Sequence, residues 1–416
     1  MQRSRLQWLY PGVGVKRWVL LIVVGAAVAG YSALVLLGLV ASQRVRDQLG
    51  VGWAAGHPLR VAAVATLVLA LGGAALGIGL VRLFRFSRPE GGVQEIRDVA
   101  RLARGPRVVA IGGGTGLAAL LRGLKHETSN LTAVVTVADD GGSSGLLRRE
   151  IGVLPPGDIR NCLVALADDE SLMSRLFQYR FADGGLQGHS FGNLFVTALA
   201  EVTGDFDRAV RESTHVLKVS GQVLPATLEN IVLHAELQGG ERVAGESTIT
   251  AAERLPQRVW LEPGKPAALP QALEALAAAD LVVLGPGSVY TSIVPNLLIP
   301  DVREAVRRTR ARVVYVCNVM TQPGETDGYT AADHLNAIYR HGAAGLVDAV
   351  LVNDAPPSAA VVASYERTGA RPVLVDDEQL AALGVRVVHA TVAAESDVFR
   401  HDPGRLAAAL IRLAGW

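Results

Sequence analysis

The sequence has few cysteines, few aromatic residues and almost no net charge. Its 416 residues include only Cys162 and Cys317, and aromatic residues make up 5% of the chain. Two distant cysteines offer neither a disulfide framework nor a C-x-x-C metal pair, which is typical of a reducing cytoplasm. A net charge of +1 provides no global field for nucleic acid. These absences argue against a disulfide-stapled domain, a cysteine zinc module and a nucleic-acid-binding protein.

Charged residues are also absent from two long apolar runs near the N-terminus. Residues 18–40 and 61–81 contain no charged side chain, and a helix needs about 20 such residues to cross a membrane. A buried core helix is the alternative for either run, and a signal peptide cut near Ala27–Ala29 is another for the first. The length of both runs favours two transmembrane helices.

Basic residues flank both apolar runs and predict their orientation. They are Arg3, Arg5, Lys16 and Arg17 before the first run, Arg44, Arg46 and Arg60 between the runs, and Arg82, Arg85 and Arg88 after the second. Positive-inside counting, four and three against three, places both termini and the main domain in the cytoplasm. We therefore predict a multi-pass protein of the cell membrane.

The remaining sequence divides into a linker and one large domain. Residues 1–83 are predicted to form the membrane anchor and residues 84–105 a basic linker. Residues 106–416 alternate strand-like and helix-like segments, which predicts an α/β domain. Between residues 215 and 261 the pattern changes to short alternating runs, and it predicts a small antiparallel β insertion. These runs are Gln222–Leu224, Ile231–Leu237, Arg242–Ala244 and Val259–Leu261.

The domain begins with an apolar strand, a glycine turn and a helix. Arg107–Ile111 is rich in Val and Ile, Gly112–Gly116 follows, and Leu117–Leu124 has apolar residues at helical spacing. Such a unit presents free backbone N–H groups at a helix N-terminus, where the dipole favours anions. Four glycines in five positions let a phosphate approach the main chain. The turn predicts phosphate binding, and a tight turn without a ligand is the alternative.

Other predicted strands also end in small or polar residues. The second strand, Leu131–Val137, ends near Asp139 and Asp140, and later strands end at Gly285–Ser288, Asn318 and Asn353. In a parallel sheet these ends lie at one edge, where ligands bind. The sequence therefore predicts a Rossmann-like, mostly parallel sheet with a polar site at that edge. Gly114–Ala119 also fits G-x-G-x-x-A with an acid after the next strand, so an NAD site is a second interpretation.

Several residues could carry chemistry. Asp139, Asp140, Asp158 and His189 are the candidate catalytic residues. Mg²⁺ at a phosphate typically needs only one or two carboxylates, so Asp139 and Asp140 are also candidate ligands for it. The alternatives are structural: Asp158 could simply cap a helix, and His189 could be a hydrogen-bonded loop residue. We find no nucleophile elbow, no Walker lysine and no metal-binding histidine pair.

Seven ordered blocks together resemble one family. They are GGGTGLAALLRGLK, TVADDGGSSGLLRRE, PPGDIRNCLVALAD, GHSFGNLF, LPATLENIVLHAE, GPGSVYTSIVPNLL and NVMTQPGETDGYTAADH. They resemble the gluconeogenesis-factor family, also called YvcK, within the CofD-like superfamily. The resemblance runs from about Arg107 to the end and leaves the first hundred residues uncovered. Many members lack the apolar pair.

The resemblance implies a Rossmann-like protein that binds UDP-N-acetylglucosamine or UDP-glucose and supports cell-wall synthesis and cell shape. Gly112–Gly116, Gly285, Gly287 and Ser288 would cradle the diphosphate, and Arg400 would neutralise it. The remaining implied ligand-binding residues would line the uridine–sugar cleft or the strand ends beside it. They are Asp139, Asp140, Asp158, Asn161, Asn193 and Asn318. The sister branch transfers a phospholactyl group with Mg²⁺.

We therefore expect a membrane-tethered, cytoplasmic UDP-sugar-binding protein. Cell-wall enzymes and a second copy of the chain are the expected protein partners, and the tether would raise the local concentration near membrane enzymes. A Mg²⁺-dependent phospholactate-type transferase is the first alternative. A nicotinamide-dependent oxidoreductase is the second, although the loop after Asp140 lacks an evident hydride-site acid–base pair. A pure scaffold is the third.

Overall fold

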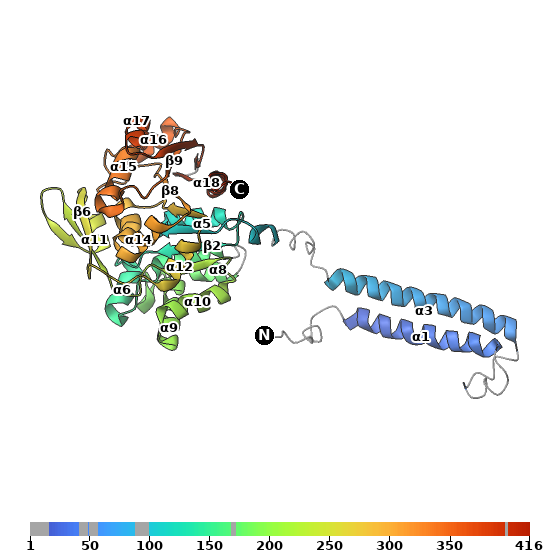
Figure 1. Cartoon of the computed structure of the whole chain (residues 1–416). Coiled ribbons are helices and arrows are strands. Elements are labelled where there is room, and N and C mark those ends of the chain that lie inside the picture. Colours follow the sequence, from blue (N-terminus) through green and yellow to red (C-terminus); the bar gives the residue numbers. More distant parts are fainter. Residues whose placement is uncertain (1–15, 41–48, 50–56, 88–99, 168–171, 396–397) are drawn as a thin grey trace. The chain divides into compact units, whose positions relative to one another are not determined.

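The computed structural model describes residues 16–40, 49, 57–87, 100–167, 172–395 and 398–416. The chain divides into two compact units, Met1–Asp98 and Val99–Trp416, and Figure 1 shows their elements. Several residues used above lie outside the described ranges. They are Arg3, Arg5, Arg44, Arg46, Arg88 and linker residues 89–99.

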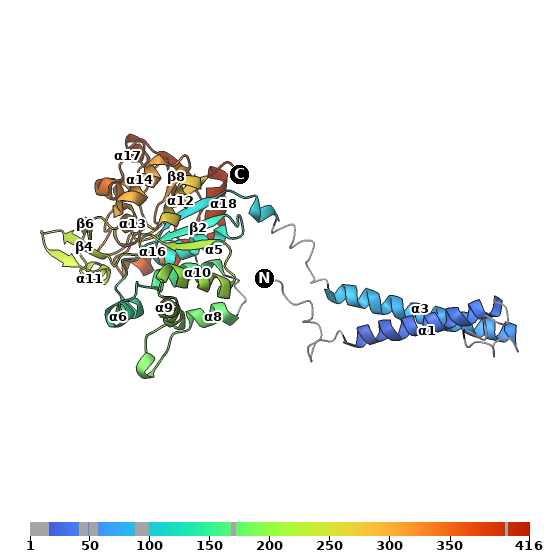
Figure 2. The same ribbon diagram turned by 60° about the horizontal axis from the view of Figure 1, so that its bottom comes forward.

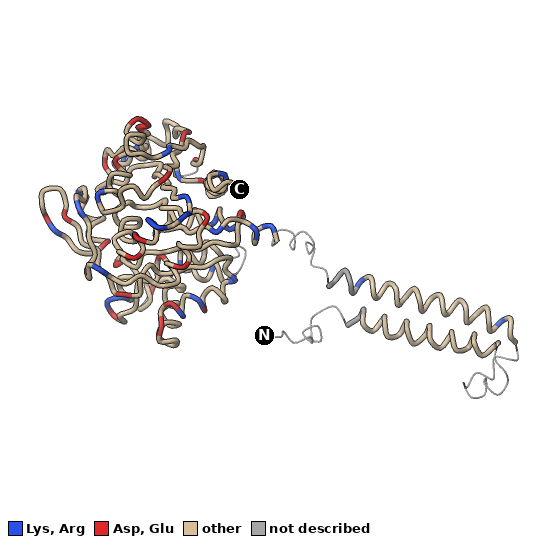
Figure 3. The backbone as a smooth tube through the Cα atoms, in the orientation of Figure 1, with Lys and Arg blue, Asp and Glu red and all other residues tan. Residues whose placement is uncertain are grey.

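The first unit is a pair of packed apolar helices, α1 (Lys16–Val40) and α3 (Pro58–Ser87). Val19–Val40 and Pro58–Arg82 are each long and apolar enough to cross a membrane. Between Arg60 and Arg82, α3 carries no charged residue (Figure 3). The two backbones meet at glycines: a Cβ on Gly25 would lie 2.9 Å from the Gly72 carbonyl oxygen. Small residues permit such close helix packing in apolar surroundings.

The second unit is built on a seven-stranded sheet with strand order β10-β9-β8-β7-β1-β2-β3. Every neighbouring pair is parallel. The strands are β1 (Val108–Gly112), β2 (Leu131–Val135), β3 (Gln222–Pro225), β7 (Leu281–Leu284), β8 (Arg312–Val316), β9 (Ala349–Asn353) and β10 (Arg386–Ala390). The chain extends the sheet from β1 in one direction through β3 and then in the other from β7. This confirms the predicted Rossmann-like α/β fold.

Helices cover both faces of this sheet (Figures 1 and 2). Successive residues of a strand face opposite sides, so Val108 and Ala110 join one buried cluster and Val109 and Ile111 the other. On the first side lie α5 (Gly114–Leu124), α7 (Gly157–Leu166), α10 (Phe206–Leu217) and α18 (Pro403–Leu413). On the second lie α12 (Pro270–Ala278), α13 (Val294–Leu298), α14 (Pro300–Arg308) and α15 (Ala331–Ile338). Burial on both faces explains why the strands read as continuous apolar runs.

The remaining elements surround this layered core. The other helices and turns are α6 (Gly142–Ile151), α8 (Leu172–Gln178), η3 (Gly184–Leu186), α9 (Phe191–Thr203), α11 (Glu246–Ala251), η4 (Val289–Ile293), η5 (Tyr339–Ala343), α16 (Ala359–Glu366) and α17 (Asp377–Ala382). A two-stranded antiparallel sheet joins β11 (Ala393–Glu395) to β12 (Phe399–His401).

The predicted antiparallel insertion is present but begins later in the chain. It comprises β4 (Val232–Leu237), β5 (Arg242–Ala244) and β6 (Pro256–Glu262), with β4 in the centre. Gln222–Leu224, which the sequence pattern assigned to the insertion, instead belongs to β3 and pairs in parallel with β2. A run this short has no clear period, and its place at the sheet edge is decided by packing against α10 and α7.

Candidate functional site

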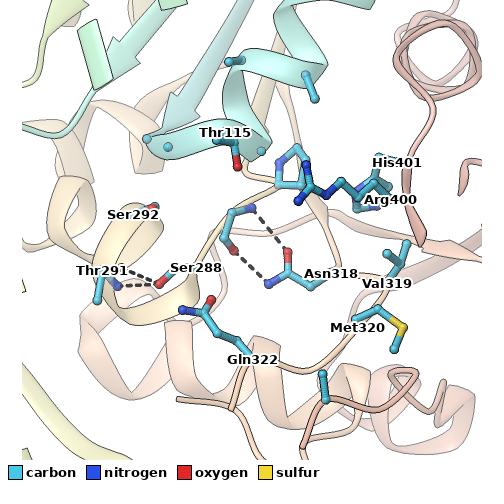
Figure 4. Close-up of a pocket in the computed structure, with 18 of the residues that line it drawn as sticks. Thr115, Ser288, Thr291, Ser292, Asn318, Val319, Met320, Gln322, Arg400 and His401 are labelled. Carbon is cyan, nitrogen blue, oxygen red and sulfur yellow. Dashed lines mark hydrogen bonds between the residues drawn. The ribbon is translucent and has the colours of Figure 1, made fainter. Parts of the chain in front are cut away.

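A large cavity lies at the carboxyl ends of the strands, where β1 and β7 are neighbours and the order of the strands along the chain reverses. Parallel sheets bind ligands at this switch point. The cavity has a volume of about 920 Å³ and is lined by both glycine junctions, Gly113–Gly116 and Gly287–Ser288. Arg122 and Arg400 bring positive charge to it. Figure 4 shows Ser288, Asn318, Arg400 and His401 around the same space.

Packing within the protein requires the glycines of the first junction. A Cβ on Gly113 would lie 2.5 Å from Asp158 Oδ2, and one on Gly116 would lie 2.5 Å from the Pro286 carbonyl oxygen. Gly114 has a φ of +65°, which side chains rarely adopt. The glycine content alone is therefore no evidence for a ligand. The first-turn N–H groups of α5, however, have no intrahelical acceptors, and Thr115 and Gly116 line the cavity.

The second junction holds its donors in internal hydrogen bonds. Gly287 N–H donates to Asn318 Oδ1 at 3.3 Å, and Asn318 Nδ2 donates back to the Gly287 carbonyl oxygen at 2.9 Å (Figure 4). Glu325, which is 3% exposed, accepts from Tyr290 N–H at 2.8 Å and from the Ser288 hydroxyl. An internal carboxylate thus occupies the N-terminus of η4. At the first junction the carboxylate of Asp158 accepts only from Gly114 N–H, so the N–H groups of Thr115 and Gly116, which line the cavity, are the donors left to an anion.

Two carboxyl groups near the first junction, those of Asp158 and Glu246, have raised pKa values. Asp158 accepts from Gly114 N–H; burial and then the nearby charge of Asp139 raise the pKa of Asp158 to about 6. Glu246 lines the large cavity. Burial, followed by the charge of Asp139, raises the pKa of Glu246 to about 7, although a hydrogen bond from Thr291 opposes the shift. Both carboxyl groups therefore change from neutral to anionic between about pH 6 and about pH 7.

We predict that the affinity of the large cavity for a diphosphate diester falls about three- to tenfold as the pH rises from about 6 to about 8. Above its pKa of about 7, Glu246 becomes an anion in the cavity and repels the diphosphate. Glu246→Gln should bind with nearly constant affinity over this range, as measured by calorimetric titration. Glu274→Gln, an exposed substitution on α12, is the control. An unchanged pH dependence in Glu246→Gln would contradict this role.

The same raised pKa values give the pH dependence of folding. Because the folded state keeps Asp158 and Glu246 protonated to higher pH than the unfolded chain does, it binds more protons from about pH 4 to about pH 7. The contribution of both groups to stability is therefore greatest below this window and declines as the pH rises through it. These two groups therefore favour the folded state more at about pH 4 than at about pH 7.

A smaller cavity of about 170 Å³ lies beside the large one, and Asn161 lines both. The small cavity is bounded by the loop and first turn of α6, by α7 and α9, and by Arg180 before η3. Its polar side chains are Asp139, Ser143, Ser144, Asp158, Arg160, Asn161, Arg180 and Asn193. The sequence therefore pointed to residues of two cavities.

The predicted site residues divide between these cavities. The large cavity is lined by Gly113, Gly114, Thr115, Gly116, Asn161, Gly287, Ser288, Asn318 and Arg400. The small cavity is lined by Asp139, Asp158, Asn161 and Asn193. Gly112 and Gly285 line neither and pack together, with 3.8 Å between a Cβ on Gly112 and the Gly285 Cα. His189 is buried, and its Nδ1 lies 3.0 Å from Ser143 Oγ.

Asp139 and Asp140 point to different neighbours. Asp139 Oδ1 accepts from Gly141 N–H at 2.9 Å, and the residue lines the small cavity. Asp140 Oδ1 accepts from Ser247 N–H at 2.8 Å, at the start of α11. Among the described residues no group of three or more His, Cys, Asp or Glu side chains is arranged for a metal. The two predicted Mg²⁺ ligands therefore do not share a cavity, since Asp139 lines the small one and Asp140 lines neither.

Comparisons with known proteins identify the family. A family model described as 2-phospho-L-lactate transferase CofD matches residues 108–393. Gluconeogenesis factors from Halalkalibacterium halodurans and Bacillus subtilis are 51% and 50% identical, over 73% and 74% of this chain and 95% and 98% of their own. The chain belongs to the gluconeogenesis-factor family. This confirms the resemblance and its place in the CofD-like superfamily.

Other comparisons extend this assignment. A crystal structure of a UPF0052 family member from Bacillus halodurans is 51% identical, with a TM-score of 0.71, and covers 73% of this chain and 99% of its own. A putative gluconeogenesis factor from a Nostoc species is 48% identical over 98% of this chain and 92% of its own. The family thus includes members that match the α/β unit alone and others that match the apolar helices as well.

For this gluconeogenesis-factor chain, sequence reasoning missed several residues of the large cavity. Glu246 begins α11 within the β insertion, and Arg122 lies on the outer face of α5. His401 follows Arg400 in the cavity, and burial lowers its pKa to about 4. No local motif surrounds Glu246, whereas Arg122 lies within the first quoted block, GGGTGLAALLRGLK, and was not selected. His401 could have been found, because it adjoins an arginine already selected.

Proposed function

We propose that this gluconeogenesis-factor chain binds UDP-sugars and regulates the supply of cell-envelope precursors. The observation that carries the proposal is the large cavity at the switch point of the sheet. The N-terminus of α5 and Arg400 supply donors and positive charge for a diphosphate at one part of its wall. Val319, Met320 and Phe399 add apolar surface suited to a base. Family membership at 48–51% identity supports the same reading.

We further propose that α1 and α3 tether the domain to the cell membrane. Large apolar side chains project from both helices; Leu20, Leu37, Leu59 and Leu71 are more than half exposed. Lipid would cover this surface. We propose that both termini lie in the cytoplasm, because the basic residues before and after the pair of apolar runs together outnumber those between them. A relative matched along 98% of the chain supports the apolar segment as part of the family architecture rather than a fusion.

The match to the CofD family model favours one alternative, a transferase that moves a phosphate-linked group from a nucleotide. In that reaction Mg²⁺ would neutralise charge on the diphosphate. Asp139 and Asp158 would hold it, because they converge beside the first glycine junction. This alternative requires turnover, and Asp158→Asn should then stop product formation while leaving binding partly intact.

Calorimetric titration of residues 99–416 tests the proposed function. This unit is compact by itself, and a solved relative corresponds to it over 99% of its own chain. UDP-N-acetylglucosamine should bind more tightly than GDP or NAD, with and without Mg²⁺, and should be recovered intact. A preference for GDP or NAD would contradict the proposal. Recovery of a cleaved nucleotide would favour the transferase.

A further inference from the structure

The small cavity has a mixed set of unused donors and acceptors. Asn193 is 2% exposed and lines this cavity, and its Oδ1 has no hydrogen-bond partner among the described residues. A buried acceptor without a donor is costly. A ligand that fills the cavity must therefore supply an N–H or O–H group to Asn193.

Neighbouring groups restrict the ligand further. Asn193 Nδ2 donates to Ser143 Oγ at 3.1 Å, and Ser143 Oγ lies 3.0 Å from His189 Nδ1. The hydrogen bond from Asn193 Nδ2 to Ser143 fixes the rotamer of Asn193 and leaves its Oδ1 as an acceptor in the wall of the small cavity. The arrangement is a preformed one, built from α6 and α9.

Charge in the small cavity is balanced. Arg160 donates to Ser190 Oγ at 2.5 Å and to Asn161 Oδ1 at 2.6 Å. Burial, followed by the nearby charge of Arg180, lowers the pKa of Arg160. Asp139 and Asp158 face these two arginines. The arginines would repel a metal ion. The aspartates would repel a phosphate, which would also offer no proton to Asn193. A neutral group rich in hydroxyls satisfies both the acceptors and the donors.

We infer that the small cavity is the subsite for the terminal sugar of the nucleotide, and that Asn193 determines its specificity for a neutral, single-ring sugar. The inference rests on the proposed function, which places the diphosphate at the first-turn N–H groups of α5. Asn161 lines both cavities, so a group attached beyond the diphosphate can enter the smaller one. A volume of about 170 Å³ equals roughly six water molecules, which suits one ring and not an oligosaccharide.

The test compares UDP with UDP-glucose and UDP-N-acetylglucosamine by calorimetry on residues 99–416. The wild-type unit should bind both UDP-sugars more tightly than UDP. Asn193→Leu should weaken the UDP-sugars by about tenfold and leave UDP unchanged, because one buried ligand donor loses its acceptor. Thr197→Val is the matched control: Thr197 lies one turn later on α9, is 4% exposed and has an unpartnered hydroxyl, but does not line the cavity.

The outcomes separate the inference from the proposed function. An equal loss for UDP and UDP-sugars in Asn193→Leu, or no loss, overturns the subsite. If Asn193→Leu does not fold, Arg180→Gln at the exposed rim gives the same readout: its UDP-sugar affinity should fall and its UDP affinity should not. A wild-type protein that binds UDP as tightly as UDP-sugars overturns the inference alone. A wild-type protein that binds neither overturns the proposed function and the inference with it.

Discussion

Arg400→Ala is expected to weaken binding of UDP-N-acetylglucosamine by about 10- to 100-fold without changing the stability of the fold. Arg400 is the exposed middle residue of β12 and lines the large cavity (Figure 4). A guanidinium that pairs with a phosphate contributes about 1.5–3 kcal/mol. Calorimetry with UDP-N-acetylglucosamine measures the loss of affinity, and thermal unfolding measures stability.

Two further variants distinguish charge from geometry at this position. Arg400→Lys keeps the charge but loses the bidentate donor fork, so part of the affinity should be lost. Arg412→Ala removes an exposed arginine from the last turn of α18, away from the cavity, and should bind as the wild type does. Equal affinities for Arg400→Ala and Arg412→Ala would remove Arg400 from the site.

The comparison of Arg400 with Glu246 shows how far the sequence could predict this site. Arg400 sits beside a capped helix start in a region that resembles the family, and the sequence selected it. Glu246 is brought to the same cavity by the β insertion, whose position depends on contacts between segments far apart in the chain. Local patterns carry no information about such contacts. Elements with strong periodicity were accordingly predicted, whereas residues delivered by tertiary packing were missed.

The first glycine junction shows a different limit. Strand, turn and helix were predicted in their observed order, because hydrophobic periodicity and glycine content are local signals. The turn was predicted too long, since Gly112 ends β1 and α5 already begins at Gly114. The reason for the glycines was not predictable. Gly113 makes room for Asp158, and Gly116 for the Pro286 carbonyl group, and both neighbours come from distant segments. Gly113→Val would therefore damage the fold, so it cannot separate a scaffold from a ligand-binding protein. Arg400→Ala can.

β3 illustrates the same principle for the fold. Gln222–Pro225 carries the strand signal but no sign of direction or neighbour. Its parallel pairing with β2 follows from α10, which brings the chain back to that edge of the sheet. The sequence thus predicted that this segment is a strand. The sheet to which the strand belongs is decided by how the helices and strands pack together.

Glu325→Ala is expected to destabilise the α/β unit by about 3 kcal/mol or more. Glu325 is 3% exposed and accepts hydrogen bonds from Tyr290 N–H and from the Ser288 hydroxyl. Alanine leaves these donors buried without an acceptor at the start of η4. Glu325→Gln retains an amide oxygen for them and should cost about 1 kcal/mol. Urea denaturation of residues 99–416 measures both losses.

This prediction also tests which glycine junction serves the ligand. Burial raises the pKa of Glu325, and the hydrogen bonds from Ser288, Tyr290 and Thr291 oppose that shift. The carboxylate therefore behaves as a built-in anion at the second junction. If this interpretation is right, Glu325→Gln changes stability without weakening binding of UDP-N-acetylglucosamine. Glu274→Ala, an exposed substitution, should change stability by no more than about 0.5 kcal/mol. Equal stabilities for Glu325→Ala and Glu274→Ala would show that the buried carboxylate does not organise this junction.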